Sequence, residues 1–198
     1  MNRIHIPTIV FLHGAWASPN CFNYIRANLI KHRAILPEYI FGPALYDTVK
    51  SVAYDINSQL DTEEYILIGH SLGGILGYRL ALDDQRCCKL VTISSPFNGS
   101  VHAATAHNLI EPWPPKMDLV PNSEFLTKLK ISEAKFKSLG LISTGGKIPM
   151  FNEPNDNVIT VATQTNSPIS NQKKIAATHS EILQHETTVK EIQKFILS

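Results

Sequence analysis

Residues 65–74 read Tyr65-Ile66-Leu67-Ile68-Gly69-His70-Ser71-Leu72-Gly73-Gly74. The first four form an unbroken apolar run, as in a strand that is buried on both faces. A helix is expected directly afterwards, over residues 72–82. Ser71 stands at the turn between them, with a glycine two residues before it and another two residues after it. A helix packed this close to its own strand leaves no room for side chains at those two positions, so the pattern predicts a sharp turn that exposes the Ser71 hydroxyl.

Short apolar runs and longer helical patterns alternate along most of the chain. We expect strands at 8–12, 33–36, 65–68, 90–93, 139–144 and 158–162, and helices at 19–31, 49–60, 72–82 and 189–197. The last helix is preceded by the capping-box pattern Thr188-Val189-Lys190-Glu191. This alternation is typical of the α/β class, in which helices join the strands of a parallel sheet.

The rhythm breaks between residues 97 and 137, where four prolines fall in a segment without strand patterns. Two short helices are expected there, near 102–109 and 123–129. A chain of 198 residues is sufficient for one domain with a sizeable core. We therefore expect a single domain over residues 1–198, with an insertion at about 97–137.

The overall composition excludes several classes of function. Hydrophobic residues make up 43% of the chain, charged residues 18%, and the formal net charge is +1. No basic cluster indicates nucleic-acid binding. The cysteines, Cys21, Cys87 and Cys88, form neither a disulfide framework nor a zinc-ligand pattern. The sequence has no signal-peptide pattern and no apolar stretch of the ~20 residues that span a bilayer, so we expect a cytoplasmic protein without membrane insertion.

The motif Gly69-His70-Ser71-Leu72-Gly73-Gly74 resembles the nucleophile elbow of the α/β-hydrolase superfamily, in the form found in lipases and esterases. The resemblance implies an α/β-hydrolase fold, with a mostly parallel central sheet of about six strands flanked by helices and a short cap insertion. It also implies that Ser71 is the nucleophile. The helix that begins at Leu72 directs its N-terminal amides toward the same point, which favours an oxyanion there.

His13-Gly14-Ala15-Trp16 follows the first expected strand and resembles the His-Gly loop of the same superfamily. The family's arrangement implies an oxyanion hole made by the amides of Ala15 and Leu72, with Trp16 as the less favoured alternative to Ala15. His13 is expected to support the loop and to transfer no proton. The loop also resembles that of plant methylesterases and hydroxynitrile lyases.

Serine needs a base within hydrogen-bond reach, and the chain contains eight histidines. The family places its base in the loop after the last strand, ahead of a closing helix. Thr178-His179-Ser180-Glu181 resembles that loop, so His179 is the expected base. His185, just ahead of the capping-box pattern, is expected at the surface.

The acid follows the serine and precedes the histidine in this superfamily. Asp156, in Asn155-Asp156-Asn157-Val158, resembles the acid of many lipases. Glu153 in the same segment is the competitor. A cluster of Asn and Asp also arises from turn propensity alone, which is the alternative explanation for Asp156.

The insertion contains two further segments, at 94–100 and 118–126, that resemble lipases acting on acylglycerols and related esters. Its apolar side chains are expected either to form an acyl pocket or to attach a small cap to the domain. The residues concerned are Leu109, Trp113, Met117, Leu119, Val120, Phe125 and Leu126. Among these, Leu119 and Phe125 are the expected substrate contacts, together with Trp16.

These features predict a serine hydrolase that cleaves carboxylic esters through a Ser71–His179–Asp156 triad and an acyl-enzyme intermediate. The expected partner is a small-molecule ester or a lipid, and the chemistry needs neither a metal nor an organic cofactor. A thioesterase, an acyltransferase or an amidase on the same fold is an alternative. A hydrolase-like binding protein without turnover is an alternative from another class.

Overall fold

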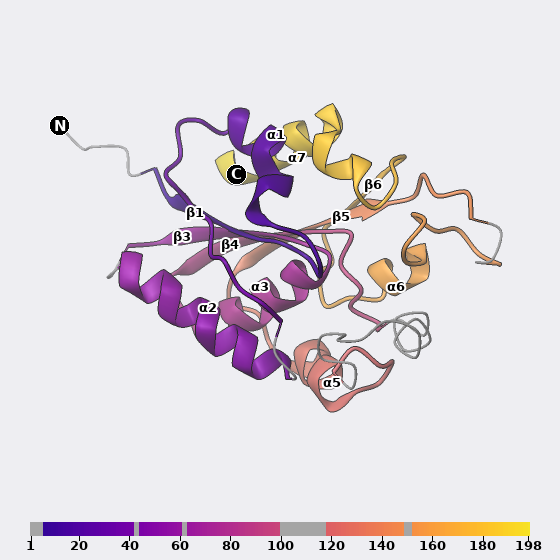
Figure 1. Ribbon diagram of the computed structural model, residues 1–198, viewed down its shortest axis with the longest axis horizontal. Coiled ribbons are helices and arrows are strands. Elements are labelled where there is room, and N and C mark those ends of the chain that lie inside the picture. The colour runs from indigo at the N-terminus through magenta and orange to yellow at the C-terminus, as the bar shows by residue number, and fades with distance from the viewer. Residues whose placement is uncertain (1–5, 42–43, 61–62, 100–117, 149–151) are drawn as a thin grey trace.

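The computed structural model describes residues 6–41, 44–60, 63–99, 118–148 and 152–198 (Figure 1). Its centre is a six-stranded sheet with the order β2-β1-β3-β4-β5-β6, in which every neighbouring pair is parallel. The strands are β1 (Thr8–Leu12), β2 (Ala34–Ile35), β3 (Tyr65–His70), β4 (Cys87–Ile93), β5 (Lys137–Ser143) and β6 (Gln172–Ile175). The prediction of an α/β fold with about six mostly parallel strands is confirmed.

Helices cover both faces of this sheet. The α2 (Leu45–Gln59), α3 (Leu72–Asp83) and α5 (Glu124–Ile131) helices lie on one face, and α1 (Asn23–Ala27) and α7 (Glu186–Leu197) lie on the other (Figure 1). The remaining helices of the described residues are short, namely η1 (Pro19–Phe22), α6 (Val161–Thr165) and η2 (Glu181–Gln184). Successive strand residues point to opposite faces. Val10 and Leu67 therefore join the core under α2 and α3, whereas Ile9 and Ile66 join the core under α1 and α7.

The prediction of a strand at 158–162 is wrong, because α6 begins at Val161. The amides of Val158 and Ile159 donate to the Asp156 carboxylate, and the Thr160 hydroxyl accepts a hydrogen bond from the amide of Thr163 at the start of α6. The amides of this segment are thus hydrogen-bonded to side chains and not to a neighbouring strand. The sixth strand is β6, whose sequence Gln-Lys-Lys-Ile lacks a strong apolar signal because it lies at the edge of the sheet.

The capping box expected at Thr188 is also wrong. The N-cap of α7 is His185, which accepts a hydrogen bond from the amide of Thr187, and Thr188 is buried within the helix. The reciprocal capping-box bonds form instead at Thr178-His179-Ser180-Glu181, which has the same spacing. There the Thr178 amide and hydroxyl donate to the Glu181 carboxylate, and the Glu181 amide donates to the Thr178 hydroxyl.

The expected helix at 19–31 is shorter than predicted and is divided into η1 and α1. The expected helix at 123–129 is α5. It is attached by Phe125, whose ring lies 5.0 Å from that of Tyr46 on α2, and by the Asp118 carboxylate, which accepts a hydrogen bond from the amide of Leu45. The helix expected at 102–109 lies outside the described residues.

No helix within the described ranges combines the length and the apolar character that a bilayer crossing requires. Because all six strands run in one direction, their carboxyl ends meet at one edge of the sheet. The segments that follow β1, β3, β5 and β6 start at this edge, and they contain Ala15, Ser71, Asp156 and His179 respectively.

Candidate active site

Ser71 occupies a strained turn between β3 and α3. Its backbone has φ 54° and ψ −125°, a conformation that non-glycine residues rarely adopt. A Cβ atom on Gly69 would lie 2.5 Å from the Cα of Gly74, and one on Gly73 would overlap the carbonyl oxygen of Leu12. The turn therefore needs glycine at both positions. For Gly69 the reason is the predicted approach of the helix to its own strand, whereas for Gly73 it is the neighbouring chain at the end of β1. The Ser71 hydroxyl does not cap α3.

The loop after β1 lies against this turn. A Cβ atom on Gly14 would be 2.8 Å from the Cβ of Ser71 and 3.4 Å from its Oγ. The loop is held from behind by Tyr39, whose hydroxyl donates a 2.7 Å hydrogen bond to the His13 carbonyl and whose ring stacks on the His13 ring with a centroid distance of 4.2 Å. Both the ring and the carbonyl of His13 thus contact Tyr39.

Two backbone amides beside Ser71 are available to a bound molecule. Among the described residues, neither the amide of Ala15 nor that of Leu72 has a hydrogen-bond acceptor. Leu72 is the first residue of α3, and the first amides of a helix lack intrahelical partners. Trp16 follows Ala15 with φ 54°, and 64% of its surface is exposed.

His179 and Asp156 are in direct contact. The Nδ1 atom of His179 lies 2.7 Å from Oδ2 of Asp156, and the His179 amide donates to the Asp156 carbonyl at 2.9 Å. The Asp156 side chain is fully buried, whereas Glu153, the other acid considered, is at the surface. His185 is half-buried at the start of α7 and is engaged by the amide of Thr187.

The Asp156 carboxylate accepts hydrogen bonds on both oxygens besides the one from His179. Oδ1 accepts from the amides of Val158 and Ile159 at 2.9 and 2.8 Å. Oδ2 accepts from the Ser143 hydroxyl at 2.5 Å and from the side-chain amide of Gln164 at 3.3 Å. Burial by itself raises the pKa of Asp156, but the hydrogen bonds from His179, Ile159 and Ser143 outweigh it and hold the pKa below its usual value. Asp156 is therefore ionised at neutral pH.

Ser143 and Gln164 were missed by sequence reasoning. Ser143 is the last residue of β5, and the Gln164 side-chain amide pairs with both backbone groups of Ser143, donating to its carbonyl and accepting from its amide. The Ser143 hydroxyl also lies 2.7 Å from that of Ser94. The position of Ser143 at a strand end was the available signal, but Gln164 had none, because it reaches Ser143 only through the fold.

His70 connects the two halves of the site. Its Nε2 lies 2.9 Å from the carbonyl oxygen of His179, and the two imidazole rings are 4.8 Å apart. Since Ser71 follows His70 directly, the serine and the His179–Asp156 pair occupy the same end of the sheet. The fold thus brings together Ser71, His179, Asp156 and the loop of Ala15.

The three residues expected to contact substrate differ in their exposure. Trp16 is exposed in the loop after β1, whereas Leu119 and Phe125 are buried in the core under α2 and α3, as is Leu126. Contact of Leu119 and Phe125 with substrate stays a prediction, and Leu109, Trp113 and Met117 lie outside the described residues. In the part of the chain that the structure describes, no three His, Cys, Asp or Glu side chains are grouped so that they could hold a metal ion.

Comparison with protein families gives one match. The model of a family described as the alpha/beta hydrolase family matches residues 9–151, most of the chain. That region includes the turn at Ser71 and the loop at Gly14 but ends before Asp156 and His179. No curated protein matches the sequence.

Comparison with solved structures gives similar folds at low identity. The mature lipase BlEst2 of Bacillus licheniformis has a TM-score of 0.80 at 16% identity, covering 98% of this chain and 93% of that one. The phospholipase PlaB of Legionella pneumophila has a TM-score of 0.75 at 13% identity, covering 96% and 59%. The tomato methylketone synthase I has a TM-score of 0.64 at 13% identity, covering 96% and 98%. At these identities the similarity shows the fold alone.

Proposed function

This chain belongs to the α/β-hydrolase family, and on that premise we propose that it is a serine hydrolase that cleaves carboxylic esters. Ser71 is the nucleophile, His179 the general base and Asp156 the acid that orients the base. The observation that carries the proposal is the 2.7 Å contact between His179 and a fully buried Asp156, joined through His70 to the strained turn of Ser71.

The proposed role of His179 as a base follows from the hydrogen bond that its Nδ1 atom makes with Asp156. Nδ1 donates its proton to the ionised Asp156, so Nε2 carries the lone pair. Nε2 takes the proton of the Ser71 hydroxyl as Oγ attacks the ester carbonyl, and it then gives that proton to the departing alcohol. Asp156 stabilises the imidazolium that exists between these two transfers.

The negative charge that develops on the carbonyl oxygen needs donors that are in place before the reaction. The amides of Ala15 and Leu72 fit this role, because both border Ser71 and neither has an acceptor among the described residues. The positive end of α3 adds to the stabilisation. Water then attacks the acyl-enzyme by the same route, with His179 as its base.

The substrate class that we propose is a small-molecule ester or a lipid. The similar folds include a lipase and a phospholipase by name, which favours ester substrates. Trp16, exposed in the same loop as Gly14, is the described side chain that we propose contacts the acyl or alcohol group.

Labelling with a fluorophosphonate tests the proposal without a guess at the substrate. We expect an adduct on Ser71, located by mass spectrometry of the modified peptide, and no adduct in Ser71→Ala. Ser71→Ala should reduce kcat by about 10⁴-fold or more without loss of folded structure. An unlabelled wild-type protein, or full activity in Ser71→Ala, would refute the assignment.

A panel of substrates then separates the alternatives. Esters of graded acyl length, matched thioesters and matched amides identify the bond that is cleaved. Addition of an alcohol acceptor distinguishes hydrolysis from acyl transfer, because transfer converts the ester into a new ester at the expense of free acid. Faster cleavage of the thioester series than of the ester series would favour a thioesterase.

A further inference from the structure

His70 is placed by the alternation of β3. Side chains along a strand point to opposite faces in turn, and Ile66 and Ile68 belong to the core under α1 and α7. His70, two residues after Ile68, therefore points to that same face. Ile182 and Leu183 of η2 pack into the same core directly after the His179 segment. The last side chain of β3 and the segment that contains His179 meet for this reason.

The hydrogen bond between them determines the state of the His70 ring. A carbonyl oxygen only accepts, so Nε2 of His70 carries the proton and donates it to the His179 carbonyl at 2.9 Å. The other nitrogen, Nδ1, is buried and has no partner among the described residues. Protonating Nδ1 would bury an unpaired N–H and a charge. Burial first, and the neighbouring His179 second, lower the pKa of His70 to about 3, so the ring stays neutral with one tautomer.

The contact also completes the support of His179. Its amide donates to the Asp156 carbonyl and its Nδ1 contacts the Asp156 carboxylate. Both of these bonds tie His179 to the 155–160 segment, and neither ties it to β3, the strand that directly precedes Ser71. Among the described residues, the hydrogen bond that ties His179 to β3 is the one from His70 to the His179 carbonyl.

We propose that His70 is a positioning residue that fixes the main chain of His179 relative to Ser71, so that Nε2 of His179 is held within reach of the serine hydroxyl. The inference rests on the proposed function. A misplacement of about 1 Å between reacting groups reduces a rate by about 10²-fold. Loss of this bond should therefore reduce kcat and leave KM nearly unchanged, because His70 is buried and in this proposal acts only through His179.

Two variants of similar length isolate the donor. His70→Gln keeps an N–H that can reach the His179 carbonyl, whereas His70→Met fills the space without a donor. We expect His70→Met to reduce kcat by about 10- to 100-fold, with KM within about threefold, and to slow fluorophosphonate labelling of Ser71 by a similar factor. His70→Gln should recover most of the wild-type rate.

The stability of the two variants separates positioning from a merely structural role. His70→Met removes a buried nitrogen that lacks a partner but also leaves the His179 carbonyl without its donor, so we expect the unfolding midpoints of the two variants in urea to lie close together. Activity should thus differ between the two variants where stability does not. Equal kcat in both, or a loss of kcat that parallels a loss of stability, would overturn the inference.

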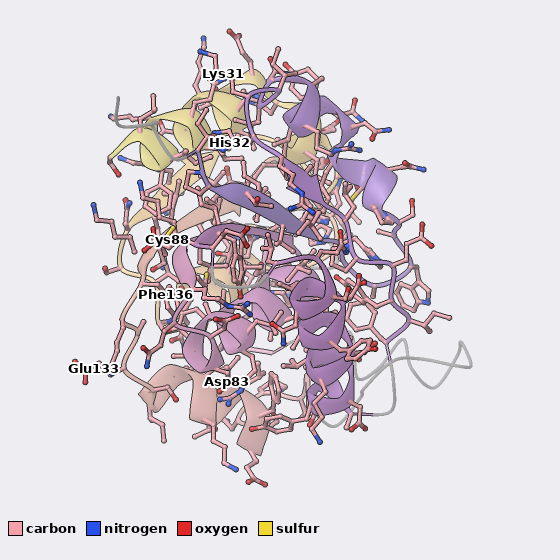
Figure 2. All side chains as sticks on the ribbon, turned by 90° about the vertical axis from the view of Figure 1, so that its left-hand side faces the viewer. Lys31, His32, Asp83, Cys88, Glu133 and Phe136 are labelled. Atoms are coloured by element: carbon pink, nitrogen blue, oxygen red, sulfur yellow. The ribbon has the colours of Figure 1, made fainter. Side chains whose placement is uncertain are left out.

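His32→Met is the matched control. The His32 ring also contacts a carbonyl from a distant segment, that of Pro7, at 2.9 Å. It does so at the amino edge of the sheet, which faces the viewer in Figure 2, opposite the serine turn. We expect its kcat to equal that of the wild type. If wild-type Ser71 is labelled and His70→Met is labelled at the same rate, the positioning role fails alone, whereas absence of labelling in the wild type refutes the proposed function itself.

Discussion

The serine turn, residues 69–74, and the acid–base segments, residues 143–164 and 176–181, meet at one edge of the sheet but are built in different ways. The turn is held by backbone contact. Gly69 lies against the backbone of Gly73 and Gly74, Gly73 lies against the Leu12 carbonyl, and the Ser71 side chain makes no cap. The acid–base segments are held by side-chain hydrogen bonds, five of which end on the Asp156 carboxylate.

This difference predicts different sensitivities. Close backbone contact leaves no space for a single added carbon, but it is indifferent to the polarity of neighbouring side chains. A buried carboxylate surrounded by donors tolerates small changes of volume but not a change in the direction of a hydrogen bond. The four predictions below test the two sensitivities, in order of decreasing expected effect.

Asp156→Asn should have the largest effect on the acid–base segments. The asparagine amide replaces one acceptor by a donor, in a position where all five partners donate. If the amide faces His179, the ring must adopt the tautomer with its proton on Nε2, which cannot accept a proton from Ser71. We expect kcat to fall by about 10³- to 10⁴-fold, measured with the best ester of the panel.

Glu153→Gln is the control for this variant, because Glu153 is the other carboxylate of the same segment and is exposed. Its kcat should stay within about twofold of the wild type. A larger loss in Glu153→Gln than in Asp156→Asn would transfer the role of the acid to Glu153.

Gly73→Ala tests the backbone contact of the serine turn. The added methyl group would overlap the carbonyl oxygens of Leu12 and His13, which β1 holds in place. We expect a loss of unfolding free energy of about 1–3 kcal/mol or more, together with reduced labelling of Ser71. Denaturation in urea measures the first and the fluorophosphonate the second.

Gly77→Ala, one turn later in α3, is the matched control. Its methyl group would meet only the side-chain ends of Leu90 and Leu12, at 3.2 and 3.5 Å, and the side chain of Leu67. These can shift, and alanine favours a helix over glycine by about 1 kcal/mol. A near-neutral result is expected there. Equal destabilisation at both positions would contradict the special status of Gly73.

Stability should fall with acid before any carboxylate is affected. Burial lowers the pKa of His70 to about 3 and also lowers the pKa of His13. Between about pH 6.5 and 3, the unfolded chain binds a proton at His70 and the folded chain does not, so stability decreases as the pH decreases, and the lowered pKa of His13 contributes in the same direction. Asp156, with its lowered pKa, contributes stability above about pH 4 that is lost only below that value.

Urea unfolding at pH 7, 5.5 and 4.5 measures this slope. His70→Met should flatten it, because one of the two histidines is gone. The same slope in His70→Met and in the wild type would show that His70 titrates normally in the folded protein, against the burial observed here.

Ser143→Ala should have the smallest effect. It removes the 2.5 Å donor to Oδ2 of Asp156 and leaves the Ser94 hydroxyl without its partner, while the remaining four bonds to the carboxylate persist. We expect a loss of stability of about 1–2 kcal/mol and a decrease of kcat of a few-fold. Ser95→Ala is the control, because the described hydrogen bond of the Ser95 hydroxyl goes to the Ile93 carbonyl, at 3.4 Å, and not to the Asp156 carboxylate; it removes an atom packed on Gly74 without adding one and should leave kcat unchanged.

The same contrast explains which features the sequence predicted. The strand at 65–68, the serine turn and its two glycines are a continuous local pattern, and the structure agrees with it in detail. The strand at 8–12 has its expected bounds, and the helix at 72–82 extends by one residue to Asp83. In these segments the propensity of each residue and the tertiary contacts favour the same conformation.

The errors fall in the segments where tertiary contacts override local preference. Val158-Ile159-Thr160 has the composition of a strand, but a buried carboxylate takes its amides. Gln172–Ile175 has a polar sequence, but β5 offers it a complete set of partners. Thr178–Glu181 and Thr188–Glu191 have the same capping-box spacing. The capping bonds form only in the first, because α7 already begins after His185 and Thr188 lies inside the helix.

The sequence alone therefore specifies the α/β class, through the alternation of strand and helix patterns along the chain, and the serine turn, through the consecutive residues 69–74. It also supplies candidate residues for the proposed triad. Tertiary structure is needed to bury Asp156 while Glu153 stays exposed, to surround Asp156 with Ser143 and Gln164, and to join His70 to His179. These pairs are separated by up to 109 residues along the chain. No local pattern encodes them, since a hydrogen bond between distant segments depends on where the sheet brings the two strand ends.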